Sequence, residues 1–486
     1  MIDIIKIAAR NLMRYKRRTL LTSLLITVGL VAVLLFISIA GSFKNMMVDQ
    51  FTDSMVGHIQ VHRRGYVGAM ESLPVDRNMR PPMLVKLYDV LDKTDEIAAW
   101  SPRIKFMAMY SNFANTTSIR LNGVYPEREI STVPLVLNRV LEGGEKAPFV
   151  KRGYIQVPEL IANGMKTKVG DTIVLVATNK EGSVNGKSFI VQGILESISG
   201  PGGRDGYLHI EDARDLLRIV DEGVDQSVLA GHGYAEPEKE LDKETLKQMD
   251  SLKAPAKQEV NAADAKQLAA ANRLKFITQS QALFKDKGWG RSSEVSEIAI
   301  RLKNRGTLDD TLAKLEAQVA DLKNKKNMTI FQIHPWEKFV PFSKIANMID
   351  LMNLFIKIIL ISVVLISIMN VLIMAVYERI REIGTMSAIG TRPQTILMMF
   401  ISEGFLLGVL GTLIGTTVSL VAVYILNQVT ITFAFGRQDN LVLVPTLAAS
   451  DVILTVVLTI IVAALASLQP AWKASRMDPI KALRHL

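Results

Sequence analysis

Residues 19–43 read TLLTSLLITVGLVAVLLFISIAGSF, a run without a single charged side chain. At 1.5 Å per residue, a helix of this length covers the roughly 30 Å of hydrocarbon in a bilayer. Three more apolar runs follow near the other end of the chain, and the third run of the four is interrupted only by Glu403. The sequence therefore predicts four transmembrane helices, at 19–43, 346–377, 396–427 and 451–472.

Basic residues beside these runs predict the topology. Lys and Arg are frequent in 1–18, in 378–395 and in 473–486, whereas 428–450 contains only Arg437. Because loops rich in Lys and Arg stay in the cytoplasm, both termini and the 378–395 loop are expected inside and 428–450 in the periplasm. Run 19–43 is too long for a signal peptide, so it is expected to remain as an anchor. The bacterial inner membrane is the expected location.

Composition agrees with a chain that meets both lipid and water. Its 486 residues have 49% hydrophobic content, a mean hydropathy of +0.23 and a net charge of +10. The excess positive charge adjoins the apolar runs and lacks interleaved aromatic residues, which argues against nucleic-acid binding. The sequence has no cysteine, so thiol chemistry and cysteine-based metal sites are excluded.

One large block, 44–345, is expected outside between the first two spans. Alternating strands and helical segments predict an α+β domain, with 44–135 and 290–340 as two parts of one split, porter-like sheet. Between them, 136–230 is predicted as a β-rich subdomain and 231–289 as a helical or flexible insertion. Apolar residues at helical spacing after span one and before span two predict that both helices continue outward as a stalk; amphipathic helices lying flat on the membrane are the alternative.

The 378–395 loop is the main candidate for contact with a soluble partner. Gly384 and Gly390 are expected to bracket a short coupling helix, and Thr391, Gln394 and Pro393 to begin the next one. Such a helix presents charges of both signs to the cytoplasm, although a simple turn is the plain alternative. The residues predicted to couple to an ATPase are Glu378, Arg379, Arg381, Glu382, Gly384, Ala388, Gly390 and Arg392.

Polar and small residues in span three form a second group of candidates. Glu403 is costly in hydrocarbon, so it is expected either to gate or bind, or to meet Arg379 or Arg381 near the headgroups. Gly404, Gly408, Gly411 and Gly415 allow another helix to approach closely. Their partner is expected to be span two or four of the same chain, or a second permease copy.

Two segments resemble a nucleotide-binding or metal-binding motif, but neither has the spacing that the motif requires. GSVNGKSF at 182–189 has three residues between its glycines where a phosphate-binding loop needs four, and a strand is expected after it. His58 and His62 lie on a predicted strand, about 13 Å apart, too far to hold one ion. We therefore expect no catalytic residue, metal site or cofactor in this chain.

The order of parts resembles the FtsX/MacB/LolE-type permeases of ABC transporters. YERIREIGTMSAIGTRPQTI at 377–396 is similar to the cytoplasmic E-R-x-R-E-I-G-x-x-x-A-x-G segment of that family, and PAWKASRMDPIKALRHL at 470–486 to its ending. NLMRYKRRTLLTSLLITVG at 11–29 resembles its beginning, and DTIVLVATN to EDARDLLRI resembles its periplasmic core. In layout the chain is closest to the lipoprotein-releasing LolC and LolE members, since MacB members carry a fused ATPase and FtsX members have a smaller exterior domain.

The resemblance implies a mechanism called mechanotransmission. A cytoplasmic ABC ATPase homodimer, which binds ATP and Mg, would dock on 378–392 and close two permease subunits, moving their periplasmic domains. The implied partners are that ATPase, a second permease subunit, membrane lipids, and a periplasmic carrier, adaptor or lipoprotein. Alternatives are an FtsX-like regulator of a periplasmic partner, or a membrane receptor; a receptor needs a cytoplasmic output domain, and the cytoplasmic segments here are short.

Overall fold

The computed structural model describes residues 2–198, 203–223, 262–323, 327–339, 343–429, 431–435 and 438–478. The chain divides into two compact units. One comprises 1–48 with 344–486 and is called the helical unit; the other comprises 49–343 and is called the exterior domain. Each unit has its own core, and each is described by itself.

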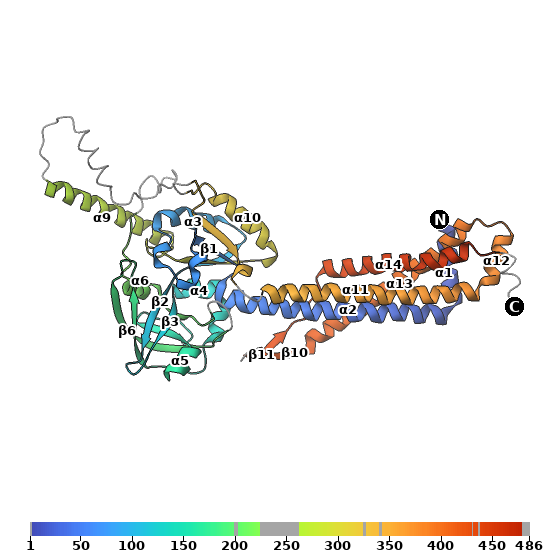
Figure 1. Cartoon of the computed structure of the whole chain (residues 1–486), viewed down its shortest axis with the longest axis horizontal. Coiled ribbons are helices and arrows are strands. Elements are labelled where there is room, and N and C mark those ends of the chain that lie inside the picture. Colours follow the sequence, from blue (N-terminus) through green and yellow to red (C-terminus); the bar gives the residue numbers. More distant parts are fainter. Residues whose placement is uncertain are drawn as a thin grey trace, which may run out of the picture. The chain divides into compact units, whose positions relative to one another are not determined.

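The helical unit is built from long helices (Figure 1). Four helical segments are long and apolar enough to cross a membrane, Thr19–Val56, Asn347–Glu378, Pro393–Val429 and Ala449–Ser475. They confirm the four predicted spans and extend beyond most of the predicted ends. The elements of this unit are α1 Ile2–Arg14, α2 Lys16–Phe51, α11 Ser343–Glu378, α12 Ile380–Ala388, α13 Pro393–Val429, the strands β10 Ile431–Phe435 and β11 Gln438–Leu443, and α14 Ala449–Ser475.

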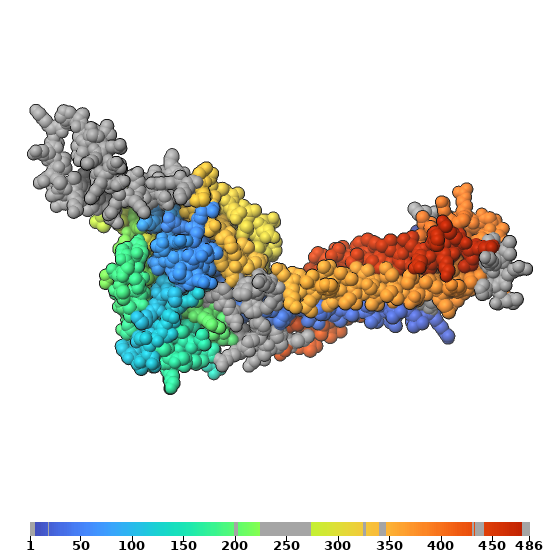
Figure 2. Space-filling view, in the orientation of Figure 1, coloured from blue at the N-terminus to red at the C-terminus, as the bar shows by residue number. Residues whose placement is uncertain are grey.

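Helices α2, α11 and α14 share one apolar core. Ile26 and Leu30 of α2, Ile368 of α11 and Ala463 of α14 are fully buried members of it. At one end of the pair, Lys44 Nζ of α2 lies 2.5 Å from Asp350 Oδ2 of α11. Helices α2 and α11 are therefore paired by packing and by an ion pair, as predicted for the stalk. Figure 2 shows the surface that α11 and α14 form along this unit.

The connection predicted at 428–450 is slightly shorter, because α13 ends at Val429 and α14 begins at Ala449, and part of it is a hairpin. Strands β10 and β11 pair antiparallel, with Ile431 opposite Leu443. The segment between β11 and α14 is hydrogen-bonded to α2: the backbone N–H of Thr446 donates to Ser42 Oγ at 3.0 Å. This connection brings the start of α14 next to α2.

In the exterior domain, two separated stretches form one split βαβ sheet. Strand order is β2–β8–β1–β9, and all three pairings are antiparallel. The predicted sharing of one sheet by two distant stretches is therefore present in the structure. Its elements are β1 Ile59–Arg63, α3 Pro81–Lys93, β2 Ile97–Ser111, β8 Glu297–Leu302, α10 Leu308–Val319 and β9 Phe331–Pro335.

Strand β2 also belongs to a second structure, a closed ring of six strands. The ring runs β2–β3–β7–β4–β6–β5 and returns to β2, with β3–β7 and β4–β6 parallel. Its strands and helices are β3 Thr116–Val124, α4 Pro126–Thr132, β4 Tyr154–Pro158, α5 Glu159–Met165, β5 Thr172–Thr178, β6 Val184–Leu195, β7 Gly206–His209 and α6 Ile210–Leu217. Short 3₁₀ or π turns lie at Thr52–Val56, Val67–Ser72, Val75–Arg77, Pro134–Arg139, Arg305–Thr307 and Trp336–Lys338.

This ring corrects the predicted division of the exterior domain at residue 135. The β-rich stretch does not stand alone, because β2 and β3 from the first stretch complete its ring. Strand β2 is 15 residues long; its first half pairs with β8 and its second half with β5. A strand of that length reaches two partners in succession, and the hydropathy pattern of each strand does not reveal which partners it meets.

A buried ionic cluster joins β2 to β8 and β1. Arg103 Nη1 lies 2.9 Å from Glu297 Oε1, and Lys105 Nζ lies 2.8 Å from Glu297 Oε2. Arg103 also binds Glu129, and His62 Nε2 lies 3.3 Å from Glu297. Burial alone would raise the pKa of Glu297, but Lys105, His62 and Arg103 outweigh it and hold that pKa well below its usual range. Burial lowers the pKa of His62, and Glu297 offsets only part of this.

The predicted insertion at 231–289 is partly a helix. Helix α9 covers Ala262–Asp286, and residues 231–261 lie outside the described part of the chain. The end of α9 packs on the domain: Phe284 is fully buried, and its ring lies against Tyr88 and Trp289. The C-terminal stretch of the insertion is therefore anchored to the core of the exterior domain.

Candidate functional site

The candidate site is the α12 segment of the helical unit together with the side chains that hold it. Helix α11 ends at Glu378, and α12 begins at Ile380. Arg379 lies between them with a backbone φ of −109° and ψ of 18°, outside the helical range, so the chain changes direction there. The Arg379 side chain is therefore positioned at a helix junction and points into the unit, where it is 4% exposed.

Five side chains connect α12 to α1 and α13, and we call them the Arg379 cluster: Asn11, Arg14, Arg379, Glu382 and Glu403. Arg379 Nη1 lies 2.9 Å from Glu403 Oε1, and its Nε lies 2.9 Å from Glu382 Oε2. Asn11 Nδ2 donates to the same oxygen of Glu403 at 2.6 Å. Arg14 Nη1 reaches Glu382 Oε1 at 3.3 Å. The cluster is a chain of charge-assisted contacts between α1, the α11–α12 junction and α13.

The contacts of the Arg379 cluster extend from a buried end at Glu403 to a solvent-exposed end at Arg14. Glu403 is 0% exposed, whereas the side chain of Glu382 is 40% exposed and that of Arg14 is 68% exposed. An exposed ion pair adds little stability, while a buried charge that loses its partner is destabilising. Loss of the buried Arg379–Glu403 pair should therefore destabilise the unit more than loss of the exposed Arg14–Glu382 pair.

Apolar packing also holds the face of α12 that lies toward the helical unit. Ile383 is fully buried and packs in a cluster with Val376 of α11, Phe400 of α13 and Ala471 of α14. The α12 segment is thus joined to the ends of three long helices by packing as well as by charge. A displacement of α12 must move these helix ends or break both sets of contacts.

The opposite face of α12 is exposed. Five residues predicted to couple to an ATPase are exposed: Glu378 at the end of α11, Arg381 and Ala388 of α12, and Gly390 and Arg392 in the turn that follows α12. Ile389 at the end of the helix is 79% exposed, the most exposed large apolar side chain in the described part of the chain. Gly390 has a φ of +92° and its N–H binds Ser387 O, a left-handed helix end that favours glycine. The exposed side therefore combines charges with the large apolar side chain of Ile389 at its tip.

Two of the residues predicted to couple to an ATPase lie inside the helical unit, and their part in coupling stays a prediction. Arg379 and Gly384 are buried, so neither is available to touch a docked protein in this conformation. Gly384 does not bracket the helix either; it lies inside α12, and only Gly390 follows its end. The side-chain direction of Arg379 depends on the change of direction after Glu378, which its residue type does not reveal. Glu382 takes part in the cluster and is half-exposed.

The structure also decides between the alternatives for span three. Glu403 meets Arg379, as one alternative expected, rather than standing alone. A Cβ added to Gly404 would lie 2.6 Å from Ser467 Cβ of α14, and one added to Gly408 would lie 2.6 Å from Ala463 Cβ. At Gly411 and Gly415 the neighbours are Ile26 and Leu30 of α2. The glycine row is therefore filled by spans four and one of the same chain: the predicted packing against span four is present, and span one takes the place expected for span two.

Three residues of the site were not singled out from the sequence. Asn11 and Arg14 belong to α1, which packs on α13, and their role follows from that packing alone. Ile389 occupies an unnamed position of the family-like segment at 377–396. Its apolar side chain directly before a glycine was the available signal.

The histidines and the glycine-rich segment belong to the exterior domain and not to the helical unit. His62 binds Glu297, whereas His58 Nε2 lies 3.4 Å from Asp53 Oδ1, so the two rings have different partners. Segment 182–189 leads into strand β6 rather than a helix, as expected. It therefore lacks the helix N-terminus on which a phosphate-binding loop depends.

Comparisons with known proteins agree with this architecture. Residues 354–479 match the family model described as FtsX-like permease C-terminal, and residues 19–249 match the MacB-like periplasmic core domain. Among curated relatives, a macrolide export ATP-binding/permease protein MacB of Syntrophobacter fumaroxidans is 36% identical over 24% of this chain and 14% of its own length. The ABC transporter permease YtrF of Bacillus subtilis is 36% identical over 23% of this chain and 27% of its own length.

A lipoprotein-releasing system transmembrane protein LolC of Xylella fastidiosa is 26% identical over 23% of this chain and 30% of its own length. The matches thus span less than a third of each of these relatives. Among solved structures, the periplasmic region of MacB from Actinobacillus actinomycetemcomitans is similar to this chain at 9% identity and a TM-score of 0.28. The match covers 59% of this chain and 92% of that structure. On its two matched domains and its four apolar helices, the chain belongs to the ABC transporter permeases of the FtsX, MacB and LolC type.

Proposed function

We propose that the chain is the non-catalytic permease subunit of an ABC transporter, and that it receives force from a separate cytoplasmic ATPase through α12. The ATPase homodimer would bind ATP and Mg and contact the exposed face of α12. The chain would work with a second permease subunit. Its exterior domain, on the periplasmic side of the inner membrane, would move in response.

The Arg379 cluster is the observation that carries this proposal. A partner that moves α12 acts through Arg379 on Glu403 of α13 and through the buried Ile383 on the ends of three helices. One of those helices, α11, is continuous from Ser343 to Glu378. A continuous helix paired with α2 along a shared core moves as a rigid body, because packed interfaces resist gradual deformation.

Charge distribution supports the proposed orientation. Basic residues gather in α1, around α12 and after α14, at the ends proposed to lie in the cytoplasm. At the other ends of the helices, Lys44 and Lys357 are paired with Asp350 and Asp451. Paired lysines add little net positive charge, so they do not oppose this orientation.

The proposed substrate is a lipoprotein or another hydrophobic molecule released or exported from the inner membrane or the periplasm. The relatives named above include proteins for macrolide export and for lipoprotein release, both of which handle substrates with apolar parts. A periplasmic carrier or adaptor would accept the released substrate.

The first test is purification of the tagged chain from its native membrane, followed by identification of the proteins that accompany it. We expect an ABC ATPase to co-purify. Recovery of the chain without any ATPase, across mild and strong detergents, would sink the proposal and favour a receptor.

The second test alters the exposed face of α12. Arg381→Glu reverses an exposed charge and should lower the substrate-stimulated ATPase activity of the assembled complex about tenfold, while membrane insertion and unfolding temperature stay unchanged. Arg476→Glu reverses an exposed charge directly after α14, outside the 378–395 loop, and serves as the matched control. Equal ATPase activity in both variants contradicts docking through α12.

A further inference from the structure

The six-stranded ring of the exterior domain carries a hollow on its outer surface. Met107 and Met109 of β2 point outward and are 43% and 49% exposed, whereas Ala108 between them points into the ring and is 5% exposed. Val176 of β5 lies directly across from Met109, and Val184 of β6 from Thr178. These four apolar side chains form the floor of what we call the Met107 hollow.

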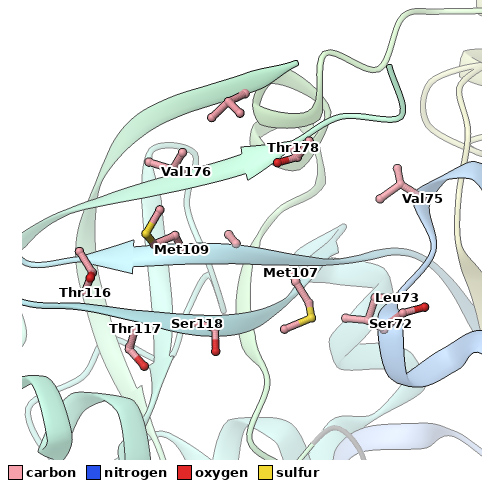
Figure 3. A pocket seen from close by; sticks show the side chains of 12 residues that line it. Ser72, Leu73, Val75, Met107, Met109, Thr116, Thr117, Ser118, Val176 and Thr178 are labelled. Carbon is pink, nitrogen blue, oxygen red and sulfur yellow. The ribbon is translucent and has the colours of Figure 1, made fainter. Parts of the chain in front are cut away.

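A wall closes one side of this floor. Leu73 directly follows one short 3₁₀ turn and Val75 begins the next, both before α3, and Figure 3 shows these residues on the same side of the hollow as Met107. The hollow has a volume of about 690 Å³. That lies within the 300–1,000 Å³ of ordinary ligand sites. An outward sheet face that is both apolar and concave is a typical binding surface, because exposed apolar patches cost free energy unless something covers them.

The chemistry of the lining selects the ligand. Seven of the twelve described lining residues are apolar, including Ala108, whose side chain points into the ring, and the other five carry only a hydroxyl, such as Thr116 and Ser118 on β3. None of the twelve is charged, although charged residues make up 21% of the chain. A carboxylate, phosphate or ammonium group inside the hollow would lose water without gaining a partner.

The lining also contains no aromatic ring among the described residues. A flat aromatic ligand is usually held by stacking, and a strongly polar one by buried donors, and this hollow offers neither. What remains is recognition by burial of apolar surface. Methionine side chains are flexible and polarisable, and they adapt to irregular apolar shapes.

We propose that the Met107 hollow binds a single acyl chain of an amphiphile whose polar end stays in solvent. The apolar floor covers the hydrocarbon, and the hydroxyls of Ser72, Thr116 and Ser118 are polar groups of the lining that can face the uncharged start of the chain. The site is independent of the proposed coupling through α12, since binding to the exterior domain needs no ATPase.

The test uses the full chain in nanodiscs without detergent. The probe is a monoacylglycerol with a photoreactive diazirine near the end of its acyl chain, added from the aqueous phase. We expect cross-links in peptides that cover 105–118 and 172–186. Unlabelled monoacylglycerols should compete, and each added methylene should strengthen competition about threefold to fourfold beyond its effect on partitioning into the discs.

Two variants separate the hollow from the rest of the surface. Met109→Lys places a charge on the floor and should lower cross-linking at these peptides at least tenfold. Leu160→Lys adds the same charge at an apolar position of α5 that is 53% exposed and outside the hollow, and it should leave labelling unchanged. If Met109→Lys does not insert as a monodisperse chain, the milder double variant Met107→Ser with Met109→Ser takes its place, with an expected loss of at least fivefold.

Specific outcomes overturn the proposal. Equal labelling in the Met109→Lys and Leu160→Lys chains, or labelling confined to the candidate membrane spans, removes the site. A compact aromatic photoprobe that competes as well as the acyl chain contradicts the ligand class. Because no ATPase is present, a negative result here leaves the coupling proposal standing, and loss of coupling in Arg381→Glu leaves this site standing.

Discussion

Arg379 and Glu403 form a buried ion pair, with Nη1 of the guanidinium 2.9 Å from Oε1 of the carboxylate. The two residues are exposed by 4% and 0%. Arg379 stands at the α11–α12 junction and Glu403 inside α13, so the pair joins the start of α12 to a candidate membrane span. The family-like segment at 377–396 thus has an inner face that holds the helix ends and an outer face that is open to a partner.

Replacing one member of the pair should lower the stability of the helical unit more than replacing both members. Arg379→Met leaves the buried Glu403 with Asn11 as its remaining described partner and should destabilise the helical unit by about 3–5 kcal/mol. Adding Glu403→Gln to the same chain removes the uncompensated charge and should restore most of that loss. Unfolding in a fixed detergent measures both variants. A double variant as unstable as the sum of the two single variants contradicts a direct pair.

The close contact of Gly408 with Ala463 predicts that a methyl group added at one residue is tolerated when the methyl group of the other is removed. Gly408→Ala places a Cβ 2.6 Å from Ala463 Cβ, closer than carbon atoms approach, and should cost about 1–3 kcal/mol. Ala463→Gly in the same chain moves the methyl group back across the contact and should recover at least half of that cost. Thr417→Leu, at an exposed position of α13, is the control for added bulk and should be neutral. No recovery in the double variant means that these helices do not pack as described.

Acid should destabilise the exterior domain through His62. Its pKa in the folded chain is lowered by burial, so the unfolded chain binds a proton first as the pH falls below about 6.5. The free energy of unfolding therefore decreases on acidification, and Glu297, whose folded pKa is also low, adds a further loss below about pH 4.5. Thermal unfolding at pH 7 and pH 5 should show a smaller decrease for His62→Gln than for the parent chain. Parallel profiles exclude His62 as the cause.

Pairing of α2 and α11 is open to a direct cross-linking test because the chain contains no cysteine. Lys44→Cys with Asp350→Cys replaces the two members of a close ion pair and should react nearly completely with a short bifunctional maleimide. Ile39→Cys with Asp350→Cys moves one thiol to an exposed position of α2 and should give at least fivefold less cross-link. Equal yields from both pairs support the alternative of helices that lie flat on the membrane.

The candidate spans and the split sheet of the exterior domain could be predicted because their signals are local or periodic. An uncharged run such as 19–43 meets the length requirement of a bilayer whatever its neighbours are, and strands at both ends of the exterior domain alternate in polarity. The glycines of span three likewise predicted a close helix contact, and Glu403 a nearby cation. Each of these inferences needs only the residues themselves and the solvent they must meet.

Which partner each surface meets was decided by the tertiary structure alone. The glycine row contacts α14 and α2, β2 divides its length between β8 and β5, and Arg379 points inward although its motif suggested an outward, docking role. A residue type states what environment a side chain needs, but several elements of this chain offer the same environment. The choice among them depends on how all the elements pack at once, because each pairing restricts the space left for the others.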